Sequence, residues 1–315
     1  MKYLLLILAI SITACFAPKN AEPVTMSKLG LNGTQLVNQN NEPVVLRGIS
    51  FGWHNLWPRF YNEGSVKELV TKWNANVIRA SMGIELNKRG YLGSPEESKK
   101  LIKQVVDAAI ANNVYVIIDW HDHNIHTKES VEFFSEMSSI YGRRPNVIYE
   151  IYNEPDRETW PEVKAYSIEV IKAIRKNDPD NIILVGSPQW SQALHLPAQD
   201  PIKGFDNLMY TMHFYAGTHK QWLRDTTDAA MRAGLPVFIS ECAGMEATGN
   251  GPIDYAEWKR YVDWMKDRKL SWVAWSLSDK DETCSMLLPA AASDGNWDDA
   301  VIKEWGKMVR KELEE

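Results

Sequence analysis

The sequence predicts an α/β protein, a (β/α)8 TIM barrel with a small N-terminal β-hairpin that closes the barrel floor. From residue 44 onward, eight short β-branched runs alternate with amphipathic helical stretches. The starts of successive runs are 26 to 38 residues apart, which is the pitch of one strand plus one helix. No linker rich in Pro, Gly or Ser interrupts residues 44–315, so a single domain is expected. The predicted strands are 44–50, 77–82, 115–120, 147–152, 182–187, 208–213, 237–242 and 272–277.

The first 15 residues, MKYLLLILAISITAC, predict a signal peptide. Lys2 precedes an apolar run that is too short for a membrane span of about 20 residues. The ending Ile-Thr-Ala-Cys resembles the lipobox of bacterial lipoproteins, in which Cys15 becomes the lipidated first residue. Ordinary cleavage near Ala14 is the alternative. We therefore expect residues 1–15 to be removed, 16–26 to form a flexible tether, and 27–315 to fold as one domain of a membrane-anchored lipoprotein, periplasmic or at the cell surface.

Turn and capping residues define two further elements. Residues 29–43 contain the turn signals Asn-Gly and Asn-Asn, which predict the hairpin. A helix is predicted to begin at Pro95, with Ser94 as its N-cap and Glu97 as the reciprocal capping residue, and to end at Asn112.

Two other classes are disfavoured by composition and motif. A doubly wound open sheet requires a Gly-rich phosphate turn after its first strand, but Gly-Trp-His-Asn follows here. The net charge of −6, without a basic run, argues against nucleic-acid binding. Besides Cys15 the chain has Cys242 and Cys284; one disulfide is conceivable, but two free, partly buried thiols are favoured.

Histidine and tryptophan gather where the predicted strands end, the edge that carries the active site in such barrels. Flat aromatic rings beside polar groups suit stacking on the apolar C–H faces of sugars. The histidines in this position are residues 54, 121, 123, 126, 195, 213 and 219. The tryptophans are residues 53, 57, 120, 190, 275 and 297. A ligand cleft is therefore favoured over ordinary packing for this group.

Two carboxylates end the fourth and seventh strands, Glu154 and Glu241. Such a pair is what glycoside hydrolysis needs, because one acid protonates the leaving oxygen and the other attacks or activates water. Glu150 lies four residues deeper than Glu154, about 13 Å along a strand. Alternation predicts that Glu150, Asp119 and Arg47 point into the barrel, where buried charges must pair, so we interpret them as a structural ion network.

A catalytic metal is the main alternative chemistry. His121, Asp122, His123 and His126 could be ligands, as in barrel hydrolases that hold metal with a His-x-His pair. Such sites draw further ligands from several strands, and the fifth strand here ends Val-Gly-Ser-Pro. We expect no metal and no cofactor, and we interpret His123 and His126 as loop residues near a sugar site.

Seven motifs in order carry a family resemblance over residues 29–315. They are LRGIS (46–50), VIRASMG (77–83), VIIDWHDH (116–123), VIYEIYNEP (147–155), HFYAGTH (213–219), VFISECA (237–243) and WSLSDKDET (275–283). Together they resemble glycoside hydrolase family 5, and closely its bacterial cellulase branch of endo-β-1,4-glucanases. Cys284 is a mild departure, since a small residue such as Ser is expected there.

The resemblance implies a role for each matching residue. Glu154 matches the acid/base, Glu241 the nucleophile, and Asn153 the residue that holds the sugar 2-hydroxyl. The other matches surround these two acids or line the cleft. They are Arg79 and Tyr215 as donors to the nucleophile, His121 and Trp275 in the subsite before the scissile bond, His213 beside the acid/base, and His54, Trp57, Tyr91, Trp190, Lys280 and Glu282 as subsite contacts.

The implied activity is that of a retaining endo-β-1,4-glucanase, a monomer acting on cellulose or mixed-linkage β-glucan. Its two carboxyl groups are expected about 5–5.5 Å apart. Desolvation near a second carboxylate is expected to raise the pKa of Glu154, giving an optimum between pH ~5 and ~7. The alternatives are the same chemistry on β-mannan, xylan or xyloglucan, and a non-catalytic glycan-binding protein on a decayed barrel. Both acids and their partners are present, which disfavours the latter.

Overall fold

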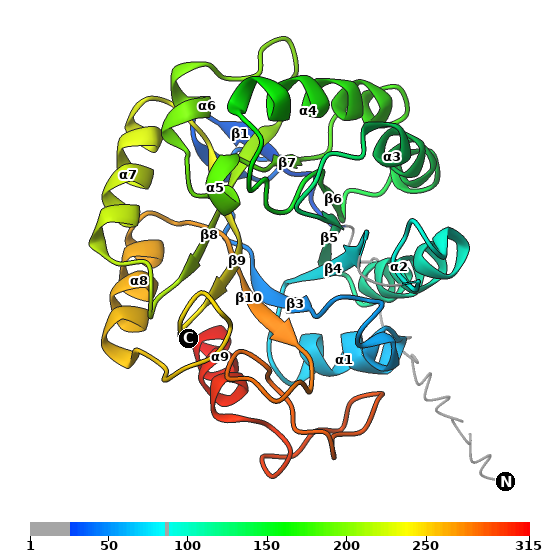
Figure 1. Cartoon of the computed structure of the whole chain (residues 1–315), viewed down its shortest axis with the longest axis vertical. Helices are drawn as coiled ribbons and strands as arrows, with labels where there is room; N and C mark the ends of the chain where they lie inside the picture. The colour runs from blue at the N-terminus through cyan, green and yellow to red at the C-terminus, as the bar shows by residue number, and fades with distance from the viewer. Residues whose placement is uncertain (1–25, 86–87) are drawn as a thin grey trace, which may run out of the picture.

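The computed structural model describes residues 26–85 and 88–315, and in this part of the chain eight parallel strands close into a barrel (Figure 1). Neighbouring strands follow the chain order from β3 to β10, and β10 pairs with β3. The predicted barrel is confirmed. Its strands are β3 Arg47–Phe51, β4 Val77–Gly83, β5 Tyr115–His121, β6 Val147–Glu150, β7 Ile183–Val185, β8 Leu208–Tyr215, β9 Val237–Ala243 and β10 Trp272–Leu277.

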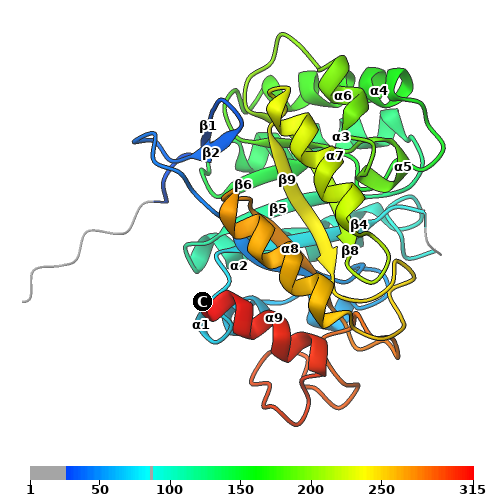
Figure 2. The ribbon, with the colours of Figure 1, turned by 90° about the vertical axis from the view of Figure 1, so that its left-hand side faces the viewer.

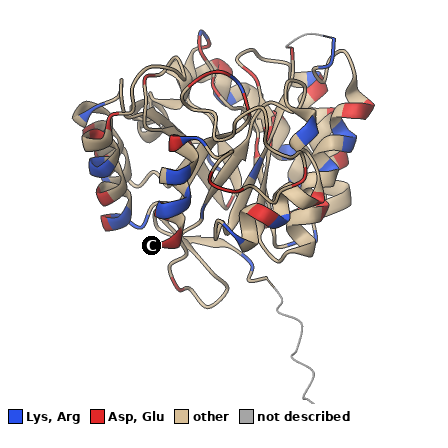
Figure 3. Cartoon of the chain, turned by 90° about the horizontal axis from the view of Figure 1, so that it is seen from below, with Lys and Arg blue, Asp and Glu red and all other residues tan. Residues whose placement is uncertain are grey.

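Helices surround the barrel and bury the outer faces of its strands (Figure 1). The helices are α1 Glu63–Thr71, α2 Pro95–Ala111, α3 Thr127–Tyr141, α4 Trp160–Arg175, α5 Pro188–Ser191, α6 His195–Gln199, α7 Gln221–Arg232, α8 Tyr255–Asp267 and α9 Glu304–Glu314, with a short 3-10 helix at Pro58–Phe60. Acidic and basic residues are interspersed over them, without a face of one sign in the view of Figure 3. Of the helices in the described ranges, none is long and apolar enough to cross a membrane.

The N-terminal hairpin closes one end of the barrel, as predicted (Figure 2). Its strands, β1 Gly30–Asn32 and β2 Gln35–Val37, pair antiparallel around Gly33, which has a φ of 62°. Leu29 and Leu36 join the apolar cluster that fills the lower barrel. The predicted signal segment 1–15, with Cys15, and all but the last residue of the tether 16–26 lie outside the described residues.

Helix α2 has the predicted boundaries but not the predicted capping box. Ser94 is the N-cap and Asn112 the C-cap. The Ser94 hydroxyl, however, donates to the carbonyl of Lys88 at 3.0 Å, and Glu97 instead lies 3.6 Å from Lys100. The Ser94 side chain therefore closes the loop before the helix instead of capping the helix.

The orientation predicted for Arg47 is wrong. Its Nη1 donates to the carbonyl oxygen of Glu312 in α9, at 3.2 Å, so the side chain lies outside the barrel. Ser50 is the β3 residue that faces the interior, where its Oγ lies 2.9 Å from Ser81 Oγ. Because side chains alternate along a strand, a residue three positions earlier faces the other side.

Candidate active site

A cleft of about 750 Å³ opens at the C-terminal ends of the strands. It is lined by Trp53, Leu56, Trp57, His121, His123, Glu154, Trp190, Gln192, His213, Tyr215, Thr218, His219, Glu241, Ala247, Thr248, Gly249, Trp275, Lys280, Glu282 and Cys284. Both predicted catalytic glutamates are among these residues. One oxygen of Glu154 lies within 4.8 Å of one oxygen of Glu241, so the two carboxylates are close neighbours.

Glu154 sits just beyond β6, on a segment held by backbone hydrogen bonds to the end of β5. The Asn153 amide donates to the Trp120 carbonyl at 3.1 Å, and the Glu154 amide to the Asp122 carbonyl at 3.2 Å. Glu241 lies within β9 itself. Both acids are therefore fixed by the barrel rather than by long loops, which restricts their movement relative to each other.

Two donors hold the Glu241 carboxylate. Arg79 Nη1 donates to Oε2 at 3.0 Å, and the Tyr215 hydroxyl to Oε1 at 2.7 Å. Arg79 is fully buried, which by itself would lower its pKa, but the carboxylates of Asp119, Glu150 and Glu241 outweigh burial and raise it. Burial raises the pKa of Tyr215 as well. A permanent cation and a neutral phenol thus face the predicted nucleophile, as expected.

Glu150 belongs to a buried network that reaches both predicted catalytic acids. It accepts from Arg79 Nε at 2.7 Å and from Ser240 Oγ at 2.6 Å. Ser240 Oγ also lies 2.9 Å from His213 Nε2, and His213 Nδ1 lies 2.8 Å from Glu154 Oε1. Since the Ser240 hydrogen goes to Glu150, its oxygen accepts from His213. The predicted ion pairing of Glu150 and Asp119 is confirmed, with Arg79 as the shared cation.

His213 therefore carries hydrogens on both ring nitrogens and is an imidazolium ion. Burial opposes this charge, but the hydrogen bonds involving Glu150 and Glu154 raise the pKa of His213 to about 9. The sequence-based expectation of a raised pKa at Glu154 is wrong for this state of the protein. Burial does act in that direction, but the hydrogen bond from His213 outweighs it and lowers the Glu154 pKa. The charged His213 in contact with Glu154 thus determines the direction of the pKa shift.

His121, Trp275 and Asn153 lie beside the two acids, as predicted. The His121 ring stacks on Trp275 with centroids 5.1 Å apart, and its Nδ1 donates to Asp119 Oδ2 at 2.7 Å. Burial lowers the pKa of His121 to about 3, so the ring is neutral. Asn153 Oδ1 accepts from Arg79 at 2.6 Å, and its buried Nδ2 has no hydrogen-bond partner among the described residues, which makes that amide available to a ligand.

The outer predicted contacts divide into two groups. Trp57, Trp190, Lys280 and Glu282 line the cleft. The Trp190 side chain is half exposed, and Lys280 forms an ion pair with Glu282. This places an aromatic platform and an ion pair on the rim.

His54 and Tyr91 do not line the cleft, contrary to their predicted role as subsite contacts. His54 is buried, donates through Nε2 to Ser98 Oγ at 2.8 Å and accepts at Nδ1 from the Gly83 amide at 3.0 Å. Burial lowers its pKa to about 4. Tyr91 is also buried and packs edge-on against Trp120, with ring centroids 5.1 Å apart. Both rings therefore belong to the packed interior rather than to the cleft surface.

Sequence reasoning missed several lining residues: Leu56, Gln192, Thr218, Ala247, Thr248 and Gly249. The sequence could have indicated them only by position, because each follows a strand at the C-terminal edge of the barrel.

Trp120 and Trp297 were predicted to lie on this face, but they are buried instead. Trp120 packs against Phe133, and Trp297 packs against Phe60. Cys242 and Cys284 are free and buried, as favoured.

Two groups of side chains could hold a metal ion within the described part of the chain. One is Glu154, His213 and Glu241, whose atoms are already engaged as described above. The other, Glu85, Asp122 and His126, lies outside the cleft. The cleft itself therefore offers two carboxylates, a histidine and aromatic surfaces.

A parallel barrel with two close carboxylates at its C-terminal edge defines the class of barrel glycoside hydrolases. Comparison with known proteins identifies the family within this class. The family description "Cellulase (glycosyl hydrolase family 5)" matches residues 37–281. The chain therefore belongs to the cellulase family, glycosyl hydrolase family 5.

Endoglucanases and solved structures match most of this chain. An endoglucanase of Clostridium saccharobutylicum is 41% identical over 93% of this chain and 67% of its own length, and endoglucanase A of Evansella cellulosilytica is 42% identical over 87% and 57%. The chain thus spans about two thirds or less of these relatives. The catalytic domain of a Thermobifida fusca endoglucanase superposes with a TM-score of 0.86 at 33% identity, covering 91% of this chain and 97% of that domain. A structure from Cytophaga hutchinsonii gives a TM-score of 0.89 at 42% identity, covering 91% and 94%.

Proposed function

We propose that the protein is a retaining endo-β-1,4-glucanase that cleaves internal bonds of cellulose or mixed-linkage β-glucan. The observation that carries the proposal is the placement of Glu154 and Glu241, with oxygens within 4.8 Å of each other in one cleft. Such proximity favours a retaining pair, whose carboxyl groups are about 5–5.5 Å apart, over an inverting pair, whose groups are about 6.5–9.5 Å apart to admit a water molecule. The names of the endoglucanase relatives support the same reaction.

The mechanism follows from the positions of the two acids on either side of one cleft. Glu154 reacts from its protonated form, although the contact with His213 favours the ionised one. A Glu241 oxygen attacks the anomeric carbon while Glu154 donates its proton to the glycosidic oxygen, so that the C–O bond to the leaving sugar breaks. Glu154, now ionised, takes a proton from water, whose oxygen attacks the same carbon and releases Glu241. Arg79 and Tyr215 keep Glu241 aimed throughout. The free Nδ2 of Asn153 is the donor placed for the sugar 2-hydroxyl.

Hydrolysis of carboxymethylcellulose by Glu154→Gln and Glu241→Gln tests the assignment. Loss of the acid is expected to lower kcat by about 10²–10⁴. An aryl cellobioside with a nitrophenolate leaving group needs no protonation, so Glu154→Gln should still form the glycosyl-enzyme from it. Glu241→Gln should not. Glu169→Gln, an exposed acid on α4, is the matched control. Undiminished activity of either active-site variant contradicts the proposal.

The substrate class is open to direct measurement. The Thermobifida fusca catalytic domain, 32% identical to this chain, has been solved in complex with cellotetraose, which favours a glucan here. We expect turnover of carboxymethylcellulose and barley β-glucan to exceed that of β-mannan, xylan and xyloglucan. A preference for one of the latter would transfer the same mechanism to another β-glycan. Specific binding without turnover on the whole panel would favour the non-catalytic alternative.

Export and lipidation are a separate proposal, supported by the N-terminal sequence alone. We propose that Cys15 carries the lipid anchor and that the mature enzyme is a monomer at a bacterial membrane, periplasmic or at the cell surface. Cys15→Ser should abolish incorporation of a fatty-acid analogue and release the protein from the membrane fraction. Continued labelling of the variant would refute the assignment. Sedimentation of the released enzyme measures the oligomeric state.

A further inference from the structure

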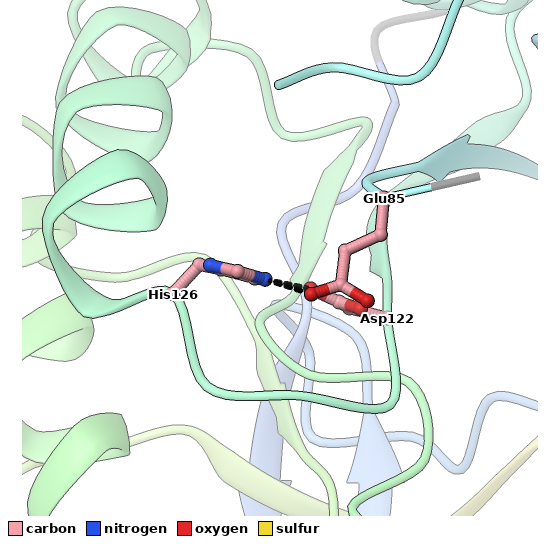
Figure 4. A group of neighbouring side chains, drawn as sticks. All are labelled: Glu85, Asp122 and His126. Atoms are coloured by element: carbon pink, nitrogen blue, oxygen red, sulfur yellow. Dashed lines mark hydrogen bonds and ion pairs between the residues drawn. The ribbon is translucent and has the colours of Figure 1, made fainter. Parts of the chain in front are cut away.

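Three side chains from two loops converge, as Figure 4 shows, and none of the three lines the cleft. Glu85 follows β4, Asp122 follows β5, and His126 is the N-cap residue of α3. His126 Nε2 lies 2.7 Å from Glu85 Oε1 and 3.6 Å from Asp122 Oδ2. One ligand-type atom from each residue lies within 4.8 Å of the other two.

Each carboxylate is held by one oxygen and presents the other to this group. Glu85 Oε2 accepts from Asn124 Nδ2 at 2.9 Å. Asp122 Oδ1 accepts from the His123 amide at 2.8 Å. The Asp122 side chain is only 4% exposed, yet its Oδ2 has no hydrogen-bond partner among the described residues. A buried carboxylate oxygen without a partner is costly, so it points to a ligand that the protein itself does not supply.

We propose that Glu85, Asp122 and His126 bind a divalent transition-metal cation of the zinc type, apart from the reacting atoms. One imidazole nitrogen and two carboxylate oxygens are ligands that zinc accepts, and water can complete a tetrahedral site. The histidine disfavours calcium and magnesium, which take oxygen ligands. This proposal revises the sequence-based expectation of no metal, which weighed a catalytic site only.

The geometry needs only a small adjustment to admit the ion. Bonds of about 2.0 Å in a tetrahedral site put neighbouring ligand atoms about 3.3 Å apart. The 3.6 Å separation of His126 from Asp122 is already close to this value. The 2.7 Å contact of His126 with Glu85 must open, and the Glu85 side chain, 45% exposed, is free to move outward.

Binding there would join two loops at the active-site edge of the barrel. The Asp122 carbonyl accepts the backbone hydrogen bond from Glu154, and His123 Nδ1 donates to the Glu154 carbonyl at 3.2 Å. A cation that immobilises Asp122 thus stabilises the segment that carries the acid/base. The expected effect is on thermal stability, because any ligand that binds only the folded state shifts unfolding to higher temperature.

Zinc binding to chelator-stripped protein tests the site by calorimetry and thermal unfolding. The wild type should bind one Zn²⁺ in the micromolar range or tighter and gain thermal stability. Glu85→Gln and His126→Gln should each weaken binding at least tenfold and lose the Zn²⁺-dependent stabilisation. His195→Gln, a change at an exposed histidine on α6, is the matched control and should behave as the wild type.

The active-site group Glu154, His213 and Glu241 is the competing location for the ion. Glu154→Gln disrupts that group and leaves the proposed ligands intact, so it should bind Zn²⁺ as the wild type does. Loss of binding in Glu154→Gln with retention in His126→Gln would overturn the proposal, as would no binding by the wild type. These readouts do not depend on turnover, so their failure is distinguishable from failure of the proposed hydrolase.

Discussion

Replacing Glu150 by Gln should move the pH profile of the enzyme, although Glu150 is fully buried and does not line the cleft. Its charge holds His213 in the imidazolium form through Ser240, and His213 in turn donates to Glu154. In the Glu150→Gln variant, the new side-chain amide would have a hydrogen to donate to Ser240, whose own hydrogen could then go to His213 Nε2. The histidine would become neutral, with its remaining hydrogen on Nδ1 facing Glu154.

The size of the shift follows from the contact between His213 and Glu154. A full opposite charge within about 4–6 Å changes a carboxyl pKa by about 1–3 units, and here the two atoms are 2.8 Å apart. Loss of the charge on His213 therefore raises the pKa of Glu154. Because the acid/base must be protonated to donate, the alkaline limb of kcat/KM should move up by about one pH unit or more.

The assay is kcat/KM on an unactivated cello-oligosaccharide, measured from pH 4 to 9. Removing one member of a buried ion pair costs about 3–5 kcal/mol, and the lower figure applies because Arg79 keeps Asp119 and Glu241. A loss of about 5–10 °C in Tm is expected. Ser240→Ala keeps the Glu150 charge and should shift the limb less. A folded Glu150→Gln enzyme with an unmoved alkaline limb would refute the relay.

Three further predictions address the nucleophile, the rim and pH stability. Tyr215→Phe removes a hydrogen bond to a charged group and should lower kcat/KM about 10- to 100-fold on carboxymethylcellulose, with an unchanged Tm; a smaller loss would remove Tyr215 from the mechanism. Trp190→Ala should raise KM several-fold without destabilising the fold, because the indole is half exposed, and equal KM values would contradict a platform role. His213 has a folded-state pKa of about 9, above its ordinary 6.5, so its stabilisation is present in full below pH 6.5 and lost as pH rises through 9. Thermal unfolding of wild type and His213→Asn across this range should converge at high pH.

The barrel was predictable because its signals are periodic and local. Eight apolar runs at an even spacing leave little freedom in topology, and the last strand, Trp272–Leu277, has the predicted boundaries. The placement of the two proposed catalytic acids was predictable for the same reason: a residue at the end of a parallel strand must lie at the common edge of the barrel. The positions of Glu154 and Glu241 could therefore be predicted without knowing any side-chain contact.

The predictions that failed are those that depend on the direction of a side chain or on its hydrogen-bond partner. His54 and Tyr91 lie in loops beyond the strand ends, where the alternation of side chains along a strand no longer predicts their direction, and both are buried outside the cleft lining. The pKa of Glu154 depends on a chain of contacts through Ser240 and His213 that joins three strands. No spacing in the sequence reports which hydroxyl donates to which carboxylate, so burial alone predicted the wrong sign.

The buried charges around Arg79 are better explained by catalysis than by stability. Buried ion pairs are often no more stable than apolar residues of similar volume, so a cluster of one guanidinium with Asp119, Glu150 and Glu241 needs another reason to exist. Glu150 supplies one, because the same carboxylate pairs with the cation facing the nucleophile and sustains the cation facing the acid/base. Through it, the protonation of one catalytic group is coupled to the surroundings of the other, across a barrel interior that water cannot screen.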